Sequence, residues 1–223
     1  MILPLLHLCD SLFPIGGFGY SDGLEAATAS GVVSTADDLA AWIDVCLEET
    51  LGRSDGPTLV GALAAFAAAD WEALALLDRE VTALRPAAAS RRSSRAMGRR
   101  LLTTWQTLYP DARLEPVVKL ARNGDIGPAL PVAFACAAGS AGAGAHAAAE
   151  AFCYTRLAGT ISAAMRLMPI GQTDAHGLLA RVLGRLPAVV DGMLERPRAS
   201  SFTPAMDIAT MSQQYLHSRL FRS

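Results

Sequence analysis

The few side chains that could bind a metal stand at spacings that predict only incomplete sites. His146 and Glu150 are four positions apart, so on a helix both would face the same side and could begin a metal site. His7 and Cys9 are two positions apart, and on a helix their side chains would diverge. Asp10 follows Cys9 as a third possible donor, whereas no third or fourth donor is visible near His146 and Glu150. Ordinary polar roles are therefore favoured, and metal binding by these four residues is the alternative.

Motifs for nucleotide binding and catalysis are also incomplete. Gly139 and Gly144 have the glycine spacing of a phosphate-binding loop, but the lysine and hydroxyl residue that must follow are missing. Adjacent carboxylates occur at 37–38 and 48–49, where neighbouring helical positions point about 100° apart and make poor acid–base pairs. A His-Glu-x-x-His motif is absent from the sequence. We therefore expect a protein that is not an enzyme and carries no cofactor of its own.

A cluster of arginines leaves two interpretations open. It consists of Arg91, Arg92, Arg95, Arg99 and Arg100, and three of its members recur at helical spacing on one face. A solvated polar face explains such a cluster, and this is the favoured interpretation. The alternative is docking onto an acidic partner surface, since arginine pairs with carboxylates through two parallel hydrogen bonds.

The elements that must position these residues are predicted to be helices. Apolar residues recur at helical spacing through most of the chain, without a convincing alternating pattern of the β type. Ser34 is expected to cap a helix with Asp37 as its capping-box acid, and Gly124 to end another. Further helices are expected over 57–69 and over 173–194, and two more are expected to end before Pro86 and at Pro110. A long helical stretch, unbroken or kinked, is expected from 131 to about 167. The prediction is an all-α, single-domain bundle of about eight to ten helices over 1–223.

Composition excludes several classes of protein. The 223 residues carry a formal net charge of −2, so no general attraction to nucleic acid or anionic membranes is expected. The uncharged run 126–149 is rich in Ala and Gly and contains Pro128 and Pro131, which favours a buried helix over a membrane span. The start of the chain lacks the basic leader of a signal peptide, which predicts a cytoplasmic protein.

The cysteines indicate a reducing compartment. Cys9, Cys46, Cys136 and Cys153 are scattered among apolar residues, and no CxxC pair occurs. We expect free, buried thiols that pack like small hydrophobic side chains.

Two segments do not follow the helical pattern, and both match motifs of a known family. They are a glycine-rich loop at 14–23 and a tail at 196–223 that we expect to be flexible. The stretch 5–25, LLHLCDSLFPIGGFGYSDGLE, closely resembles the N-terminal signature of UreF, a family of urease accessory proteins. The stretch 161–174, ISAAMRLMPIGQTD, resembles its second motif. Asp207-Ile208 with the final SRLFRS resembles its closing motif, and the three occur in family order.

The resemblance implies a function for the whole chain. It implies an all-α fold, usually a homodimer, that binds UreD (also called UreH) and recruits the GTPase UreG to apo-urease. That assembly helps to insert nickel into urease, so the resemblance implies a chaperone or scaffold that is not an enzyme. Nickel and GTP are then handled by the assembled complex. The alternative is a nickel-binding metallochaperone in its own right, using His7, Cys9, His146 and Glu150.

The resemblance also implies which residues bind partners. Glycines in the loop permit backbone conformations that expose aromatic side chains to a partner protein. The apolar tail residues beside arginines are expected to anchor the tail to that partner. Tyr20 and Arg219 are expected to lie close together. An interior ring at Tyr20 and a frayed terminus are the alternatives. The expected partner-binding residues are Gly16, Gly17, Phe18, Tyr20, Ser21, Asp22, Gln172, Thr173, Arg219, Leu220, Phe221 and Arg222.

Two of these residues have another explanation, and two positions of the motifs depart from the family pattern. A helix beginning at Gln172 and Thr173 would explain those two residues equally well. The region 213–217 departs from the family pattern of a His-Glu pair, which counts against a metal or acid role for the tail. Gly19 stands where the family commonly has Ser.

Overall fold

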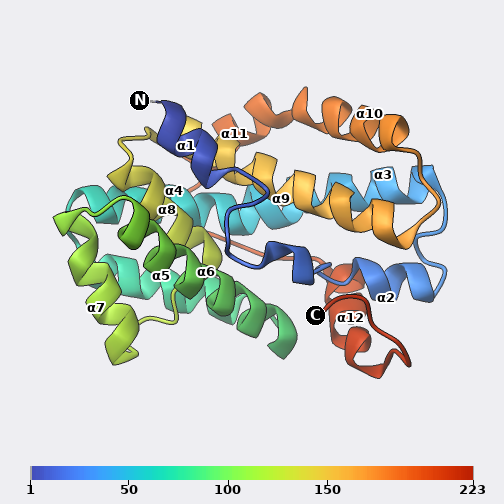
Figure 1. Ribbon diagram of the computed structural model, residues 1–223, viewed down its shortest axis with the longest axis horizontal. Coiled ribbons are helices and arrows are strands. Elements are labelled where there is room, and N and C mark those ends of the chain that lie inside the picture. The colour runs from blue at the N-terminus through green and yellow to red at the C-terminus, as the bar shows by residue number, and fades with distance from the viewer. Residues whose placement is uncertain (1, 223) are drawn as a thin grey trace.

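The computed structural model describes residues 2–222, and the regular structure of this part of the chain is helical, without strands (Figure 1). The expected all-α fold is confirmed. The α-helices are α1 (Ile2–Leu8), α2 (Leu24–Ala29), α3 (Ala36–Val45), α4 (Gly56–Ala67), α5 (Trp71–Ala83), α6 (Ala88–Leu108), α7 (Glu115–Asn123), α8 (Leu130–Ser140), α9 (Ala145–Leu167), α10 (Gln172–Leu183), α11 (Leu186–Glu195) and α12 (Pro204–Ser212). A π-helical segment, η2 (Cys46–Asp55), joins α3 to α4, and the short 3-10 turns are η1 (Gly17–Gly19), η3 (Ala112–Leu114) and η4 (Gln213–Tyr215).

The helix α8 lies at the centre of the core. Its residues 130–138 are all buried, and it packs against α4, α6 and α9. Small residues allow this close approach: a Cβ placed on Gly139 would lie 2.8 Å from the ring of Phe66. The uncharged run 126–149 therefore contains a buried helix, as predicted. None of the helices within residues 2–222 has the length and apolar character that a membrane span needs.

The ends of the helices follow local sequence signals, although one predicted cap is one residue away from the observed one. The helix α7 ends where Gly124 adopts a left-handed φ of 84°, as predicted. The predicted cap of α3 was wrong by one residue. Thr35, not Ser34, caps the helix, and Asp38, not Asp37, completes the capping box. The carboxylate of Asp38 accepts hydrogen bonds from the backbone amides of both Ser34 and Thr35, which fixes this register.

Helices are more numerous in residues 2–222 than the eight to ten expected. The stretch from 131 to 167 divides into α8 and α9 because the chain turns at Gly142, whose φ is 78°. The stretch 173–194 divides into α10 and α11, and Pro187 in the first turn of α11 marks the new start. Three further helices, α1, α2 and α12, form in segments where none was predicted.

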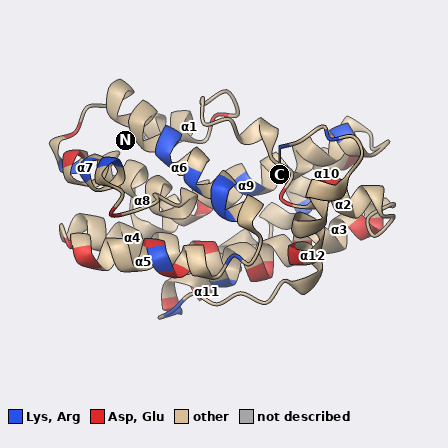
Figure 2. Cartoon of the chain, turned by 90° about the horizontal axis from the view of Figure 1, so that it is seen from below, with Lys and Arg blue, Asp and Glu red and all other residues tan. Residues whose placement is uncertain are grey.

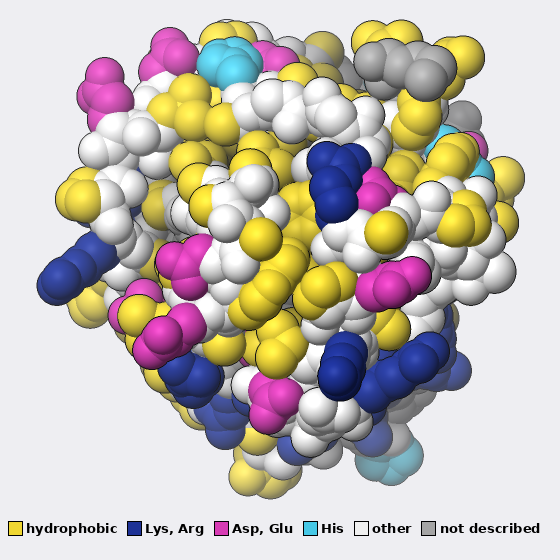
Figure 3. Space-filling model, turned by 90° about the vertical axis from the view of Figure 1, so that its left-hand side faces the viewer, with side chains coloured by type: hydrophobic (Ala, Val, Ile, Leu, Met, Phe, Trp, Pro, Cys, Tyr) yellow, Lys and Arg dark blue, Asp and Glu magenta, His cyan; other side chains and the backbone are white. Residues whose placement is uncertain are grey.

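The arrangement brings the glycine-rich loop and the C-terminal residues up to 222 side by side. In Figure 1, α9 crosses the middle of the molecule with α10 alongside it, and α12 packs against α2 near the C-terminus. The buried hydrophobic residues form one cluster that reaches from Leu8 to Phe221. On the face shown in Figure 3, hydrophobic side chains lie among charged ones, and most of the Lys and Arg side chains lie in its lower half.

Candidate functional site

The C-terminal tail docks onto the glycine-rich loop. The backbone amide of Arg222 donates a 2.7 Å hydrogen bond to the carbonyl oxygen of Gly19. The side chain of Arg222 lies against the same glycine, since a Cβ added there would be 3.6 Å from its Cδ. Two segments that the sequence separates by about the full length of the chain thus form one surface. We call this surface, made by residues 14–23 and 218–222, the loop–tail surface.

A buried carboxylate holds the tail in place. Glu25 is the second residue of α2, just after the loop, and only 6% of its surface is exposed. Its oxygens accept hydrogen bonds from the backbone amides of Leu220 and Phe221, the latter at 3.2 Å, and from the Nε2 amide of Gln213 at 2.8 Å. Bonds to an ionised acceptor are roughly twice as strong as neutral ones. Glu25 is therefore the main polar anchor of the tail, a role that our sequence analysis did not assign to it.

An arginine of the second motif joins the loop to the tail. Arg166, near the end of α9, donates a 3.0 Å hydrogen bond from Nη1 to the carbonyl oxygen of Phe18. Its guanidinium also lies 4.4 Å from the ring centroid of Phe221, a cation–π distance. Phe221 is buried, with 3% of its surface exposed. The second motif thus contributes to the loop–tail surface through Arg166, which sequence reasoning missed.

The residues predicted from the sequence fall into exposed and supporting positions. Phe18 and Leu220 are both more than half exposed, at 54% and 53%. Tyr20 is partly buried and packs against the core, whereas Arg219 is exposed. Within residues 2–222 no hydrogen bond or ion pair joins Tyr20 to Arg219, so their closeness stays a prediction.

The remaining predicted residues have structural surroundings of their own. Gly16 has a left-handed φ of 78°, and Gly17 begins the turn η1. The Ser21 hydroxyl donates a 3.3 Å hydrogen bond to Gln213 Oε1, which ties the loop to η4. Gln172 and Thr173 are the first, exposed residues of α10, which fits the helix-start interpretation.

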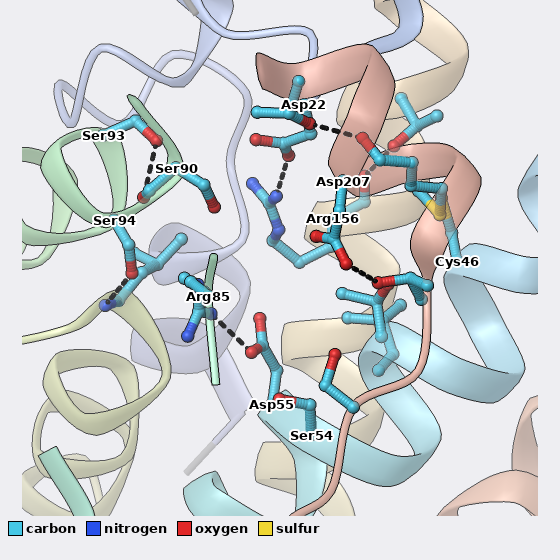
Figure 4. A pocket seen from close by; sticks show the side chains of 18 of the residues that line it. Asp22, Cys46, Ser54, Asp55, Arg85, Ser90, Ser93, Ser94, Arg156 and Asp207 are labelled. Atoms are coloured by element: carbon cyan, nitrogen blue, oxygen red, sulfur yellow. Dashed lines mark hydrogen bonds and ion pairs between the residues drawn. The ribbon is translucent and has the colours of Figure 1, made fainter. Parts of the chain in front are cut away.

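Beneath the loop lies a polar cavity of about 100 Å³, drawn in Figure 4. Asp22 projects from the loop and forms an ion pair with Arg156 of α9. Asp55, 6% exposed, forms a second pair with Arg85 at 2.5 Å. Hydroxyls of Ser54, Ser90, Ser93 and Ser94 complete much of the polar wall. The loop is thus supported from below by an ion pair rather than by apolar packing alone.

Electrostatic surroundings set the protonation of this cavity. Asp22 raises the pKa of Arg156, which keeps the guanidinium charged. Burial raises the pKa of the Cys46 thiol to about 12 and also raises the pKa of the Asp207 carboxyl. A protonated thiol is a weak nucleophile and a weak metal ligand. We therefore assign the cavity a supporting role.

A larger cavity of about 460 Å³ is lined on one side by the loop and on another by α9. Phe13, Phe134 and Phe152 contribute apolar walls, and Arg166 and Phe221 lie at its border with the tail. Because one wall is the glycine-rich loop itself, the position of the loop and the size of this cavity depend on each other.

The possible metal ligands lie in separate surroundings. His146 faces Glu150 Oε2 at 3.6 Å and Asp191 Oδ1 at 3.4 Å, on the surface between α9 and α11. His7 Nδ1 lies 2.7 Å from the Tyr109 hydroxyl. No group of three or more His, Cys, Asp or Glu residues within 2–222 is arranged to hold a metal ion.

The cysteines are free, as predicted. Cys46, Cys136 and Cys153 are buried, and Cys9 is partly buried.

Comparison with known proteins identifies the family. The UreF family model matches residues 33–183. Over the whole chain, the sequence is 34% identical to the urease accessory protein UreF of Azoarcus sp. (strain BH72), and the match covers 95% of that protein. It is 31% identical to the UreF protein of Paracidovorax citrulli and 30% identical to that of Polaromonas sp., again over the whole chain, covering 89% and 94% of those proteins. The helical fold and the joined loop and tail therefore belong to a member of the UreF family of urease accessory proteins.

Proposed function

We propose that this chain is a non-catalytic scaffold for urease maturation. It binds UreD and recruits the GTPase UreG, and the assembly delivers nickel to apo-urease in the cytoplasm. Membership of the UreF family supports the role in urease maturation. The observation that carries the scaffold role is the docking of the tail onto the glycine-rich loop through Glu25.

The loop–tail surface has the composition of a protein interface. Phe18 and Leu220 expose apolar side chains, while Arg219 and Arg222 are exposed beside them. Interfaces characteristically combine apolar anchors with arginine. The backbone beneath these side chains is fixed by Glu25 and Arg166, so little ordering free energy is needed when a partner binds.

The polar groups under the surface suit a supporting role better than a catalytic one. Glu25 accepts hydrogen bonds from the tail, and the Asp22 and Asp55 carboxylates are each paired with an arginine. In this proposal the chain positions its partners, and the chemistry of GTP hydrolysis and nickel binding belongs to UreG and urease. We propose that the scaffold works as a homodimer.

Co-expression with UreD and UreG tests the proposal. The expected result is that the tagged chain co-purifies with UreD and that UreG joins this complex. A strain lacking the gene is expected to make urease with little nickel and little activity. Failure to co-purify, together with undiminished urease activity in the deletion strain, would refute the scaffold role.

A second candidate function is nickel binding by the chain itself. The observation that motivates it is the exposed His146 imidazole, which lies 3.6 Å from Glu150 and 3.4 Å from Asp191, although these residues are not arranged as a metal-binding group. Calorimetry with nickel on the purified chain tests it, using His146→Ala as the matched variant. Binding tighter than about millimolar, roughly −4 kcal/mol, that is lost in the variant would support a carrier, and no such binding would end the idea.

A further inference from the structure

The helix α6 carries charge of one sign only. Its 21 residues include five arginines and no Asp or Glu. In Figure 2 it shows blue segments and no red ones, whereas α5 carries both colours. Since the net charge of the chain is −2, this concentration of positive charge is local and does not reflect the overall composition.

Within residues 2–222, Arg91 is the one arginine of the five whose side chain forms a hydrogen bond inside the protein. Arg91 is half-buried, and its Nη1 donates hydrogen bonds to the carbonyl oxygens of Arg85 at 2.6 Å and Pro86 at 2.8 Å. The other four are exposed, and none of them forms an ion pair with a carboxylate in the described part of the chain. We call these four, Arg92, Arg95, Arg99 and Arg100, the arginine face.

The arginine face lowers the stability of its own helix. Arg92 and Arg95 are three positions apart, and Arg95 and Arg99 are four apart, so their charges repel on one side of α6. Arg92 also lies near the N-terminus of the helix, where the helix dipole disfavours positive charge. Within residues 2–222 no ion pair with a carboxylate offsets this repulsion, so internal ion pairs do not explain the arrangement.

The arginine face adjoins the loop–tail surface. A Cβ added to Gly16 would lie 2.6 Å from Nη1 of Arg100, so this side chain touches the start of the glycine-rich loop. Two more exposed arginines, Arg219 and Arg222, lie in the tail that docks on the same loop. Arginine side chains therefore touch the loop at Gly16 and at Gly19, which precede and follow Phe18 in the sequence.

We infer that the arginine face binds an acidic protein surface, and that this surface belongs to the partner that docks on the loop–tail surface. The inference rests on the proposed scaffold function. Guanidinium groups pair with carboxylates in a planar, two-bond geometry, and four unpaired ones at helical spacing fit a row of Asp and Glu. Attraction between unlike charges also speeds association and selects the partner.

Other anionic partners fit the same face less well. Single-stranded nucleic acid binding stacks successive bases on exposed aromatic side chains. The aromatic residue of α6, Trp105, is buried, and Phe18 of the adjoining loop is one exposed ring rather than a row of them. A helix that lies on a membrane must insert its apolar side, but Met97, Leu101 and Trp105 pack inside the protein. An acidic protein surface needs neither feature.

The test compares two triple variants of equal charge. The first is Arg92→Gln, Arg95→Gln, Arg99→Gln, which removes three charges from the arginine face. The control is Arg79→Gln, Arg181→Gln, Arg198→Gln, which removes three exposed, unpaired arginines from α5, α10 and the segment after α11. Affinity for UreD, and of UreG for the complex with UreD, is measured from low to moderate salt. Vesicles of phosphatidylserine and a single-stranded RNA are tested as further probes.

The inference predicts a specific difference between these proteins. The arginine-face variant is expected to bind UreD or UreG about tenfold more weakly at low salt, with a flatter salt dependence, whereas the control binds like the wild type. Its melting temperature should equal or exceed that of the wild type because repulsion is relieved, which excludes misfolding.

Two kinds of result would overturn the inference, and they differ from failure of the scaffold role. If the wild type binds its partners and the arginine-face variant binds them equally well, the inference alone is wrong. The same holds if the variant loses only vesicle or RNA binding. If the wild type binds neither UreD nor UreG, the proposed function fails and this inference fails with it.

Discussion

Replacing Glu25 with Gln should release the C-terminal tail. The carboxylate accepts two backbone amides, from Leu220 and Phe221, and the side-chain amide of Gln213. Glutamine keeps one acceptor oxygen and turns an NH₂ group toward these donors. At least one buried donor is then left without a partner and the charge assistance is lost, which together cost about 3 kcal/mol.

Hydrogen exchange measures this effect directly at the tail. A loss of about 3 kcal/mol corresponds to roughly a hundredfold faster exchange of the Leu220 and Phe221 amides, up to the limit of an undocked tail. The exchange of α8 should not change, since its packing is independent of Glu25. The exposed Glu72→Gln serves as the control and should exchange like the wild type. Unchanged protection of the two amides in Glu25→Gln would refute the anchoring role of the carboxylate.

Three further predictions concern stability and reactivity. Gly98→Ala should lower the free energy of unfolding by about 2–3 kcal/mol, because its Cβ would lie 2.0 Å from a backbone carbonyl oxygen. A Cβ at Gly177 would meet open space, so Gly177→Ala should be neutral or stabilising. Thermal unfolding distinguishes the two variants. Hydrogen bonds from Ser34 and Thr35 lower the pKa of Asp38 to about 2, so its stabilisation is present above about pH 4 and lost as the pH falls toward 2. Asp38→Asn should therefore differ from the wild type in melting temperature above pH 4 and match it near pH 2. Burial raises the pKa of the Cys153 thiol to about 12, so this thiol should react with an aromatic disulfide reagent at pH 8 only after unfolding; fast reaction of the native protein would contradict its burial.

Local signals in the sequence predicted most of the helices. Apolar residues at helical spacing mark a buried stripe, and Pro and Gly mark the ends, as at Gly124. Small residues in 126–149 predicted the buried helix α8 because they permit close packing. The break at Gly142 was harder to see, since an isolated Gly in an alanine-rich run is compatible with an unbroken helix.

The contacts that build the candidate site could not be predicted from local signals. Glu25 and Phe221 are 196 positions apart, and nothing in either segment specifies that they meet. The resemblance to UreF indicated that both ends of the chain matter, but not that Glu25 and Arg166 connect them. The same limit applies to α6, where the spacing showed a cluster of arginines but not which of them form hydrogen bonds within residues 2–222, as Arg91 does.

Recruitment of UreG by the complex with UreD is the most direct test of the scaffold function. The measurement compares the full chain with a truncation lacking 211–223, which removes Gln213 and the docked tail while α2 and the loop remain. The molar mass of each assembly is determined by light scattering after size-exclusion chromatography. The account predicts that UreG joins the complex made with the full chain and not the complex made with the truncation. Equal recruitment of UreG by both would contradict the role of the loop–tail surface.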